Sequence, residues 1–272
     1  PKKLRASLTL GCIAVTFALC MGLSALDYRS AGFTFTALDV GQGQCLVYTA
    51  DGETSMVDCG GVQNESGELA ARYLEGNGVF RVERLFLTHP DADHCNGAAQ
   101  LISRVQVGTL YLPMTALREQ SDMLQTIIRT ARENGTQVRF VRENLEFPTK
   151  RGKIRVLKPD LLESGNDGGL CVLAAHEKYD ILITGDLTAQ AEYRLLSLHT
   201  LPQAAVLVAG HHGAATSTSG ALLRAVRPEA VFISAGADNR FGHPAAQTLA
   251  RIRQSGAAVY RTDLSGTITI RG

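Results

Sequence analysis

Four side chains that can bind a metal ion lie within six residues of one another, directly after an apolar segment. Residues 82–88 read VERLFLT, which predicts a buried strand, and His89, Asp91, Asp93 and His94 follow it. Imidazoles and carboxylates that converge at a strand end suit zinc, manganese or iron, and the carboxylates favour the harder of these ions. A polar loop with an aspartate capping the next helix is the alternative. Four ligand-capable residues in one place favour the metal site.

Three further segments repeat this arrangement of a strand followed by possible ligands. Asp186 follows an apolar strand, the pair His211 and His212 follows another, and His243 stands in a Phe-Gly-His-Pro sequence. Each alone is a weak signal, because aspartate after a strand is a common helix cap and adjacent histidines are common on surfaces. Their recurrence in one structural setting predicts that distant parts of the chain fold around a common cation site.

Strands and helices alternate along most of the chain. The expected strands are residues 33–38, 45–48, 54–57, 82–88, 109–112, 137–141, 154–157, 171–174, 180–184, 205–208, 230–233 and 267–270. The expected helices are residues 68–75, 96–103, 121–134, 189–198, 220–226 and 245–255. Hydrophobic residues make up 45% of the 272 and charged residues 19%, so the chain can bury a large core. This alternation predicts an α/β fold in layers, with helices outside the sheets.

The first thirty residues differ from the rest. Residues 8–26 contain no charge and no proline, and Lys2, Lys3 and Arg5 precede them. The stretch has the length and apolarity of a membrane-spanning helix, and the positive-inside rule places the residues after it outside the cell membrane. A signal peptide and a buried core helix are the alternatives. We therefore expect a transmembrane helix with its flank over residues 1–30 and a separate globular domain over residues 31–272.

Charge and cysteine content set limits on function. The chain has 27 basic and 26 acidic residues, a formal charge of +1, so the whole surface provides no electrostatic case for nucleic-acid binding. A local basic run is expected to be a solvated strand or loop; it comprises Lys150, Arg151, Lys153, Arg155 and Lys158. The cysteines Cys45, Cys59, Cys95 and Cys171 could form disulfides outside the cytoplasm, but their pairing is open.

Taken together, the motifs resemble the metallo-β-lactamase superfamily, whose pattern is H-x-H-x-D-H, then a His, then GD, then GH. From residue 33 to the end, the chain resembles more closely the C-terminal hydrolase domain of ComEC-type competence DNA-uptake channels. The matching segments are LDVGQG at 38–43, DCGG at 58–61, THPDADH at 88–94, LITGD at 182–186, GHHG at 210–213, GHP at 242–244, and RTD at 261–263 with Gly266. The resemblance implies a metallo-β-lactamase-like αββα sandwich of two mixed sheets.

Two departures from the superfamily pattern concern the metal ligands. Asp91 stands where the pattern has its second histidine, which the ComEC-like group shares. The histidine of the third motif has no clear counterpart: Asn166 or Asp167 stands about where it belongs, and His176 lies beyond. The ligation of one metal position is therefore open.

The resemblance implies one or two divalent ions, zinc or manganese, and a role for each matching residue. One ion would be held by Asp93, His94, Asp186 and one of His211 and His212, and the other by His89 and Asp91, with Asp186 bridging. The ions would generate hydroxide from water and polarise a phosphoryl or carbonyl oxygen. Asp93 would also orient the hydroxide. His243 would contact the scissile phosphate or protonate the leaving oxygen, unless it is a structural turn histidine, and Asn166 would bind substrate.

These residues are compatible with three functional hypotheses. The first is a metal-dependent nuclease of a membrane DNA-uptake channel that degrades the strand that is not imported. Its partners would be DNA, the membrane and the remaining channel segments. The second is a membrane-anchored or secreted hydrolase of another phosphodiester or of a lactam, which the near-zero net charge favours. The third is a non-catalytic module that binds DNA, which the missing third-motif histidine favours.

Overall fold

The structure is a computed structural model that describes residues 2–30, 32–62, 65–119, 121–158, 165–177 and 179–272. The helices are α1 Lys2–Ser30, α2 Ser66–Gly76, α3 Ala92–Cys95, α4 Ala98–Arg104, α5 Asp122–Glu133, α6 Ala189–Leu198, α7 Gly220–Val226, α8 Ala246–Ser255 and α9 Thr262–Ser265. The first seven strands are β1 Phe33–Ala37, β2 Cys45–Ala50, β3 Glu53–Cys59, β4 Arg81–Phe86, β5 Gln106–Pro113, β6 Gln137–Val141 and β7 Leu145–Pro148. The others are β8 Gly152–Leu157, β9 Cys171–His176, β10 Tyr179–Ile183, β11 Val206–Val208, β12 Ala230–Ile233, β13 Ala258–Arg261 and β14 Ile268–Arg271. Short 3₁₀ turns η2 Met114–Leu117, η3 Gly165–Gly168 and η4 Gly210–Gly213 complete the description.

The strands form two seven-stranded mixed sheets. The first has the order β14-β1-β2-β3-β4-β5-β6, and the second has the order β13-β12-β11-β10-β9-β8-β7. In the first sheet, β3 to β6 run parallel, and in the second, β10 to β13 run parallel. The remaining neighbours are antiparallel. The chain's last strand, β14, returns to pair with β1 in the first sheet.

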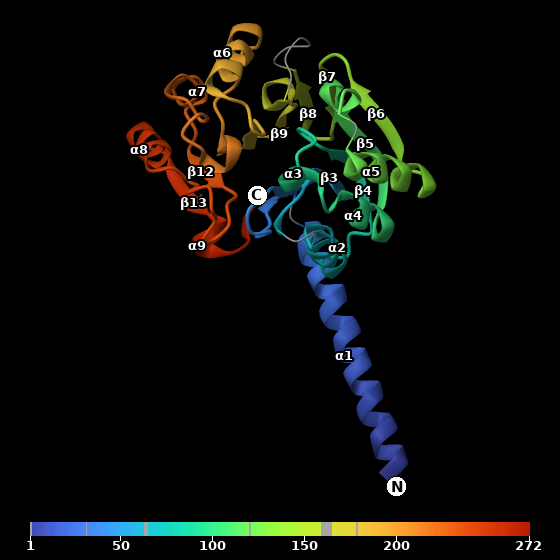
Figure 1. Ribbon diagram of the computed structural model, residues 1–272. Coiled ribbons are helices and arrows are strands. Elements are labelled where there is room, and N and C mark those ends of the chain that lie inside the picture. Colours follow the sequence, from blue (N-terminus) through green and yellow to red (C-terminus); the bar gives the residue numbers. More distant parts are fainter. Residues whose placement is uncertain (1, 31, 63–64, 120, 159–164, 178) are drawn as a thin grey trace.

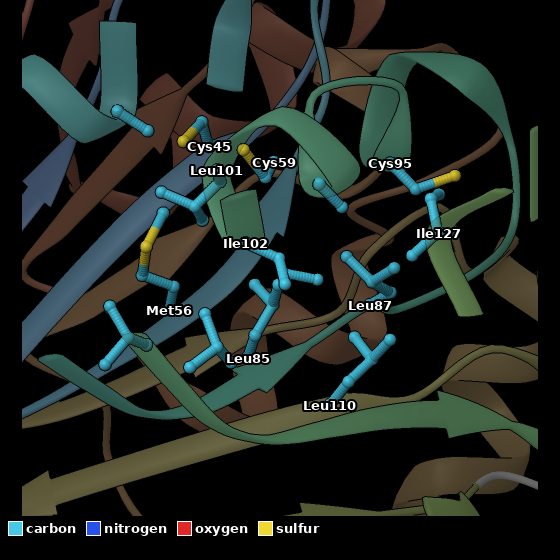
Figure 2. Close-up of a cluster of buried hydrophobic side chains, with 14 of the residues drawn as sticks. Cys45, Met56, Cys59, Leu85, Leu87, Cys95, Leu101, Ile102, Leu110 and Ile127 are labelled. Atoms are coloured by element: carbon cyan, nitrogen blue, oxygen red, sulfur yellow. The ribbon is translucent and has the colours of Figure 1, made fainter. Parts of the chain in front are cut away.

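The sheets face each other, and helices cover their outer faces (Figure 1). Between the sheets lies an apolar core that includes Phe35 and Phe232, whose ring centroids are 5.8 Å apart. A second core, shown in Figure 2, joins the first sheet to α2, α4 and α5 through side chains such as Leu101 and Ile127. A third core joins the second sheet to α6, α7 and α8. Because both faces of each sheet are covered, every residue of β1 and β2 is buried, including the threonines.

These layers bear out the predicted α/β sandwich, with differences in individual elements. The predicted helix over residues 96–103 is α4, which begins two residues later, and the short helix α3 before it was not predicted. Strands β7 and β13 were not predicted: β7 alternates half-buried and exposed residues at one end of its sheet, and β13 does the same at the other. Edge strands bury little apolar surface, which leaves only a weak pattern in the sequence.

The N-terminal helix α1 extends away from the sandwich (Figure 1). Its side chains Leu10, Ile13 and Phe17 are exposed. Within the part of the chain that the structure describes, no helix combines the length and the apolar composition needed to cross a bilayer. The predicted membrane span is therefore not confirmed.

Candidate metal centre

The loop after β4 and the short helix α3 carry the first group of predicted ligands. His89 leaves the strand and is buried, and α3 presents Asp93 and His94 beside it. The end of β3 passes directly behind α3 at Gly60, where a Cβ atom would collide with the backbone of Asp93 and His94. Glycine at this position therefore lets the strand and the helix approach closely enough to fix both ligands.

A buried carboxylate behind this group holds it in place. Asp58 is fully buried, and its Oδ1 accepts a hydrogen bond from the Thr88 backbone N–H at 2.7 Å. Its Oδ2 accepts from the Thr88 hydroxyl at 2.8 Å, from Gln44 Nε2 at 2.7 Å and from His94 Nδ1 at 2.7 Å. Asp58 belongs to the matching DCGG segment, but it was assigned no role from the sequence. Its place at the end of a buried strand could have indicated a role, because a buried carboxylate needs hydrogen-bond donors around it.

The second group of ligands comes from the parallel strands of the other sheet. Asp186 follows β10 in a turn at Gly185, and His211 and His212 follow β11. Both histidines have left-handed backbone angles, with φ of 52° and 53°, which costs of order 1–3 kcal/mol each and is typical of functional sites. The His212 Nδ1–H donates to the Ser234 carbonyl oxygen at 2.8 Å. Carboxyl ends of parallel strands from both sheets thus meet at one end of the sandwich.

The two groups converge on one point. His94 Nε2 lies 3.2 Å from His212 Nε2 and 3.1 Å from Asp186 Oδ1, and His212 Nε2 lies 3.3 Å from Asp93 Oδ2. Two triads have ligand atoms that all lie within 4.8 Å of one another, one formed by His94, Asp186 and His212 and one by His89, Asp93 and His94. The predicted ligands from three separate segments therefore share one pocket.

Asp186 lies between the histidines. Its Oδ2 is 3.6 Å from His89 Nε2 and 3.4 Å from His211 Nε2, while its Oδ1 faces His94. Asp186 is thus near histidines of both groups, and its bridging role stays a prediction. The sequence left open which of the two adjacent histidines is a ligand. His212 is buried against Asp93 and His94, whereas the side chain of His211 is 32% exposed and contacts only Asp186 among these ligands.

The hydrogen bonds of three imidazoles fix which nitrogen faces the pocket. Nδ1 of His94 donates to the Asp58 carboxylate and Nδ1 of His212 to a carbonyl. The Thr88 hydroxyl donates to Asp58 and so accepts from His89 Nδ1 at 3.1 Å. When these rings are neutral, each presents a bare Nε2 atom to its neighbours, as the binding of a metal ion requires.

This donor set fits a divalent cation. His89 Nε2 and Asp186 Oδ1 are buried and have no hydrogen-bond partner among the described residues. Lone pairs that face lone pairs in a buried pocket are unfavourable unless a cation lies between them. Imidazole with carboxylate is a donor set that zinc and manganese accept. The residues present therefore match the metal binding that the sequence predicted, without identifying the ion.

Electrostatics within the pocket keep its carboxylates ionised. Burial alone would raise the pKa of Asp93, but the neighbouring His212 and His94 lower it to about 2. Burial and His94 lower the pKa of His89 to about 4. Burial opposes charge on His94 too, yet Asp186 and Asp58 hold its pKa well above the usual value. In the absence of a cation, His94 is therefore protonated beside Asp186 and Asp58.

Other predicted site residues lie at the edge of the pocket or outside it. The Asp91 side chain is 54% exposed, with Oδ2 3.8 Å from His89 Nε2. Asp167 accepts hydrogen bonds from the Thr188 N–H and hydroxyl, both at 3.0 Å, so it caps the start of α6. Half-buried Asn166 makes no side-chain hydrogen bond to the ligands within the described ranges. His176 lies at the far end of β9 and stacks on Phe33, so it does not replace the third-motif histidine.

His243 lies beside the pocket and next to a groove. Its ring centroid is 5.5 Å from that of His211, and its buried Nδ1 has no partner within the described part of the chain. Burial and the neighbouring His211 and His212 lower its pKa. A groove of about 640 Å³ adjoins Asp93; its lining includes Gln42, Val62, Asp93, Asn96, Arg240 and Phe241. The site thus combines a candidate metal centre with space for a substrate.

The fold and this ligand set define a class of protein. The family model described as the metallo-beta-lactamase superfamily matches residues 38–237, so the chain belongs to that superfamily. The particular relatives are competence proteins of the ComEC type. The chain is 30% identical to Competence protein ComA of Neisseria gonorrhoeae and 28% identical to ComE operon protein 3 of Bacillus subtilis, over 86% of this chain in both cases. It spans about a third of those relatives, 31% and 32% of their lengths.

Solved structures show the same fold at low sequence identity. Tm1679, a metal-dependent hydrolase of the beta-lactamase superfamily, is similar with a TM-score of 0.56 and 12% identity, covering 88% of this chain and 100% of the other. CmlA beta-hydroxylase has the same TM-score at 16% identity, covering 88% of this chain and 54% of that chain. These likenesses show the fold alone, so function has to be argued from the site.

Proposed function

We propose that this chain is a metal-dependent phosphodiesterase that cleaves DNA, and that it serves as the nuclease domain of a competence DNA-uptake channel. The convergence of buried His94, Asp186 and His212 with unpartnered acceptor atoms carries the proposal, because it supports binding of divalent cations. The groove beside Asp93 supplies room for a nucleotide chain. The competence relatives favour DNA over other phosphodiesters.

Each residue contributes a distinct step. Divalent ions bound here would supply polarisation of a phosphoryl oxygen and acidification of a water molecule. Asp93 stays ionised because its pKa is about 2, so its carboxylate can accept a hydrogen bond from the attacking water and orient it. His243 is neutral near pH 7 because its pKa is lowered, so it donates a hydrogen bond to the scissile phosphate through one ring N–H. Thr88 and Asp58 keep the ring of His94 in place.

Phe241 and Arg240 suit the binding of a nucleotide next to the scissile bond. Phe241 is 55% exposed, and its ring centroid lies 5.8 Å from that of His243. The Arg240 guanidinium carbon lies 5.1 Å from the Phe241 ring centroid. An exposed aromatic ring beside a cation provides a stacking surface for a base and a charge for its phosphate. Phe241→Leu should raise the KM for single-stranded DNA several-fold and leave hydrolysis of a small chromogenic phosphodiester nearly unchanged, whereas Phe241→Trp should retain DNA cleavage.

The decisive experiment measures cleavage of single- and double-stranded DNA by the full chain with Mn²⁺ or Zn²⁺. We expect cleavage that chelation abolishes and that Asp93→Ala reduces by about 10³-fold or more. The variant His199→Ala is the matched control, since His199 is half-buried outside the pocket and contacts the Lys158 carbonyl. DNA left intact by metal-loaded protein would refute the nuclease.

A hydrolase of another ester or of a lactam is the second candidate, and the charge distribution favours it. The basic run offers little free charge for DNA: Arg151 pairs with Asp51 at 2.8 Å and Glu177 at 2.9 Å, and Lys153 pairs with Glu146 at 3.0 Å. A panel of chromogenic phosphodiesters and a chromogenic β-lactam separates the two candidates. Absence of bound metal in purified protein would instead favour a module that only binds DNA.

The membrane location is part of the same proposal. The exposed apolar side chains of α1, including Leu10, Ile13 and Phe17, would gain by leaving water for a lipid environment. The hydrolase domain over residues 31–272 would then lie outside the cell membrane. Fractionation of cells that express the chain with and without residues 1–30 tests this location. Recovery of both forms in the soluble fraction would contradict it.

A further inference from the structure

The ends of β2 and β3 bring two cysteines opposite each other. Cys45 and Cys59 are partners in the antiparallel ladder, and both are fully buried. Directly opposite residues in such a ladder have Cα atoms about 4.5–5.5 Å apart, within the usual disulfide range of about 4.4–6.8 Å. Figure 2 shows their two sulfur atoms side by side. The backbone therefore satisfies the main geometric requirement for a cross-link.

The other buried cysteines are engaged elsewhere. Cys95 Sγ donates to the carbonyl oxygens of Pro90 at 3.2 Å and Asp91 at 3.0 Å, and Figure 2 shows its sulfur well separated from the pair. Cys171 belongs to the core between the second sheet and its helices. Among the buried cysteines, the pair on β2 and β3 thus has the best geometry for a bond.

We propose that Cys45 and Cys59 form an intramolecular disulfide in the oxidised protein. The Sγ–Sγ bond forms as two S–H bonds break. Two electrons and two protons pass to a disulfide donor such as oxidised glutathione, which is cleaved to two thiols. Because both sulfurs are buried, exchange occurs while the two strands are open, during folding or local opening. In the closed protein, the contact with Cys45, burial and the charge of Asp58 raise the pKa of the Cys59 thiol well above its usual value and keep it unreactive.

The cross-link would join the residues that directly follow Gln44 and Asp58, and Asp58 supports the metal centre by accepting a hydrogen bond from His94. The register shifts between Cys45 and Leu46, so Asp58 is an extra residue in β3 directly before Cys59. Gln44, directly before Cys45, donates to Asp58 Oδ2 at 2.7 Å. Oxidation therefore links the ends of β2 and β3 covalently next to Gln44 and Asp58. After reduction, only hydrogen bonds hold these strand ends together. The disulfide does not depend on the proposed nuclease function.

The test is peptide mapping of the full chain after equilibration with oxidised and reduced glutathione. Free thiols are alkylated in denaturant, and cleavage before aspartate gives the peptides Asp39–Ala50 and Asp58–Pro90, each with one cysteine. Under oxidising conditions we expect these two peptides joined and two thiols lost. Full alkylation of both cysteines, or a bond to Cys95 or Cys171, would overturn the proposal.

Variants separate the cross-link from other effects. Cys59→Ala should abolish the joined peptides, while Cys171→Ser should retain them. Oxidation should raise the Tm of the wild-type chain by roughly 5 °C, and it should leave the Tm of Cys59→Ala unchanged. If Cys59→Ala does not fold, the mapping of wild-type and Cys171→Ser proteins still decides the question. An equal rise in the Tm of the wild-type and Cys59→Ala proteins would show that another pair of cysteines carries the effect.

Discussion

The two halves of the candidate metal centre are built in different ways. In the first half, His89, Asp93 and His94 come from one loop and one short helix, and a buried carboxylate, Asp58, supports them. In the second half, Asp186 and the pair of histidines follow separate strands, and a main-chain carbonyl orients His212. The first half therefore depends on one charged side chain, whereas the second depends on backbone geometry. Substitutions should expose this difference.

The largest effect should come from the ligand that joins the halves. His94 takes part in both triads and contacts Asp186 and His212 across the pocket. His94→Ala should abolish binding of divalent metal at stoichiometric concentration and reduce hydrolysis at least about 10³-fold. Metal analysis of the purified variant and initial rates measure both effects, with His199→Ala as control. Retention of the full metal content by His94→Ala would show that the triads do not bind metal.

The two adjacent histidines should differ in importance. His212→Ala removes a buried ring that faces Asp93 and His94, so we expect a loss of about 10²–10³-fold in activity. His211→Ala removes a partly exposed ring near Asp186 alone and should cost about tenfold. Rates and metal affinity of the two variants, measured side by side, provide the comparison. A larger loss for His211→Ala would reverse the assignment.

How much of the site could be predicted depends on the same difference. The contiguous run from His89 to His94 was recognisable because its ligands lie close together in sequence after an apolar strand. The distinction between His211 and His212 was not, since only the backbone angles after β11 decide which ring is buried. Asp58 received no role because its partner, His94, lies 36 residues away.

The fold shows the same limit. Central strands carry strong apolar patterns, and the sequence predicted them. The edge strands β7 and β13 bury little, and pairing of β14 with β1 across the whole chain is set by tertiary packing. Similarly, the four buried cysteines were visible in the sequence, but the register of β2 and β3 was needed to place two of them together.

The support of each half can be tested separately. Asp58→Asn keeps the size of the side chain but replaces an acceptor oxygen with a donor facing His94, Thr88 and Gln44. We expect a 10–100-fold loss in metal affinity. Ser234→Ala is the counterpart in the second half: it removes a hydroxyl that donates to the Gly43 carbonyl but keeps the main-chain carbonyl that holds His212. The metal affinity of Ser234→Ala should stay within about threefold of the wild-type value. Titration with Mn²⁺ measures both, and equal losses would remove the contrast between side-chain and backbone support.

The smallest effect is a pH dependence centred on His94, which contacts a carboxylate from each half. Asp186 and Asp58 hold the pKa of His94 above its unfolded value of 6.5, so protonation of His94 stabilises the metal-free protein fully below pH 6.5. This stabilisation is lost as the pH rises through the raised pKa, and the Tm of metal-free protein should fall by a few degrees over that range.

A bound cation competes with the same proton on His94, so metal affinity should instead rise, about tenfold per pH unit below that pKa. Asp58→Asn removes one of the two carboxylates and should move both transitions to lower pH. Thermal melts with and without Mn²⁺ between pH 6 and 10 measure them, and a metal-free Tm that rises over this range would contradict the charge on His94.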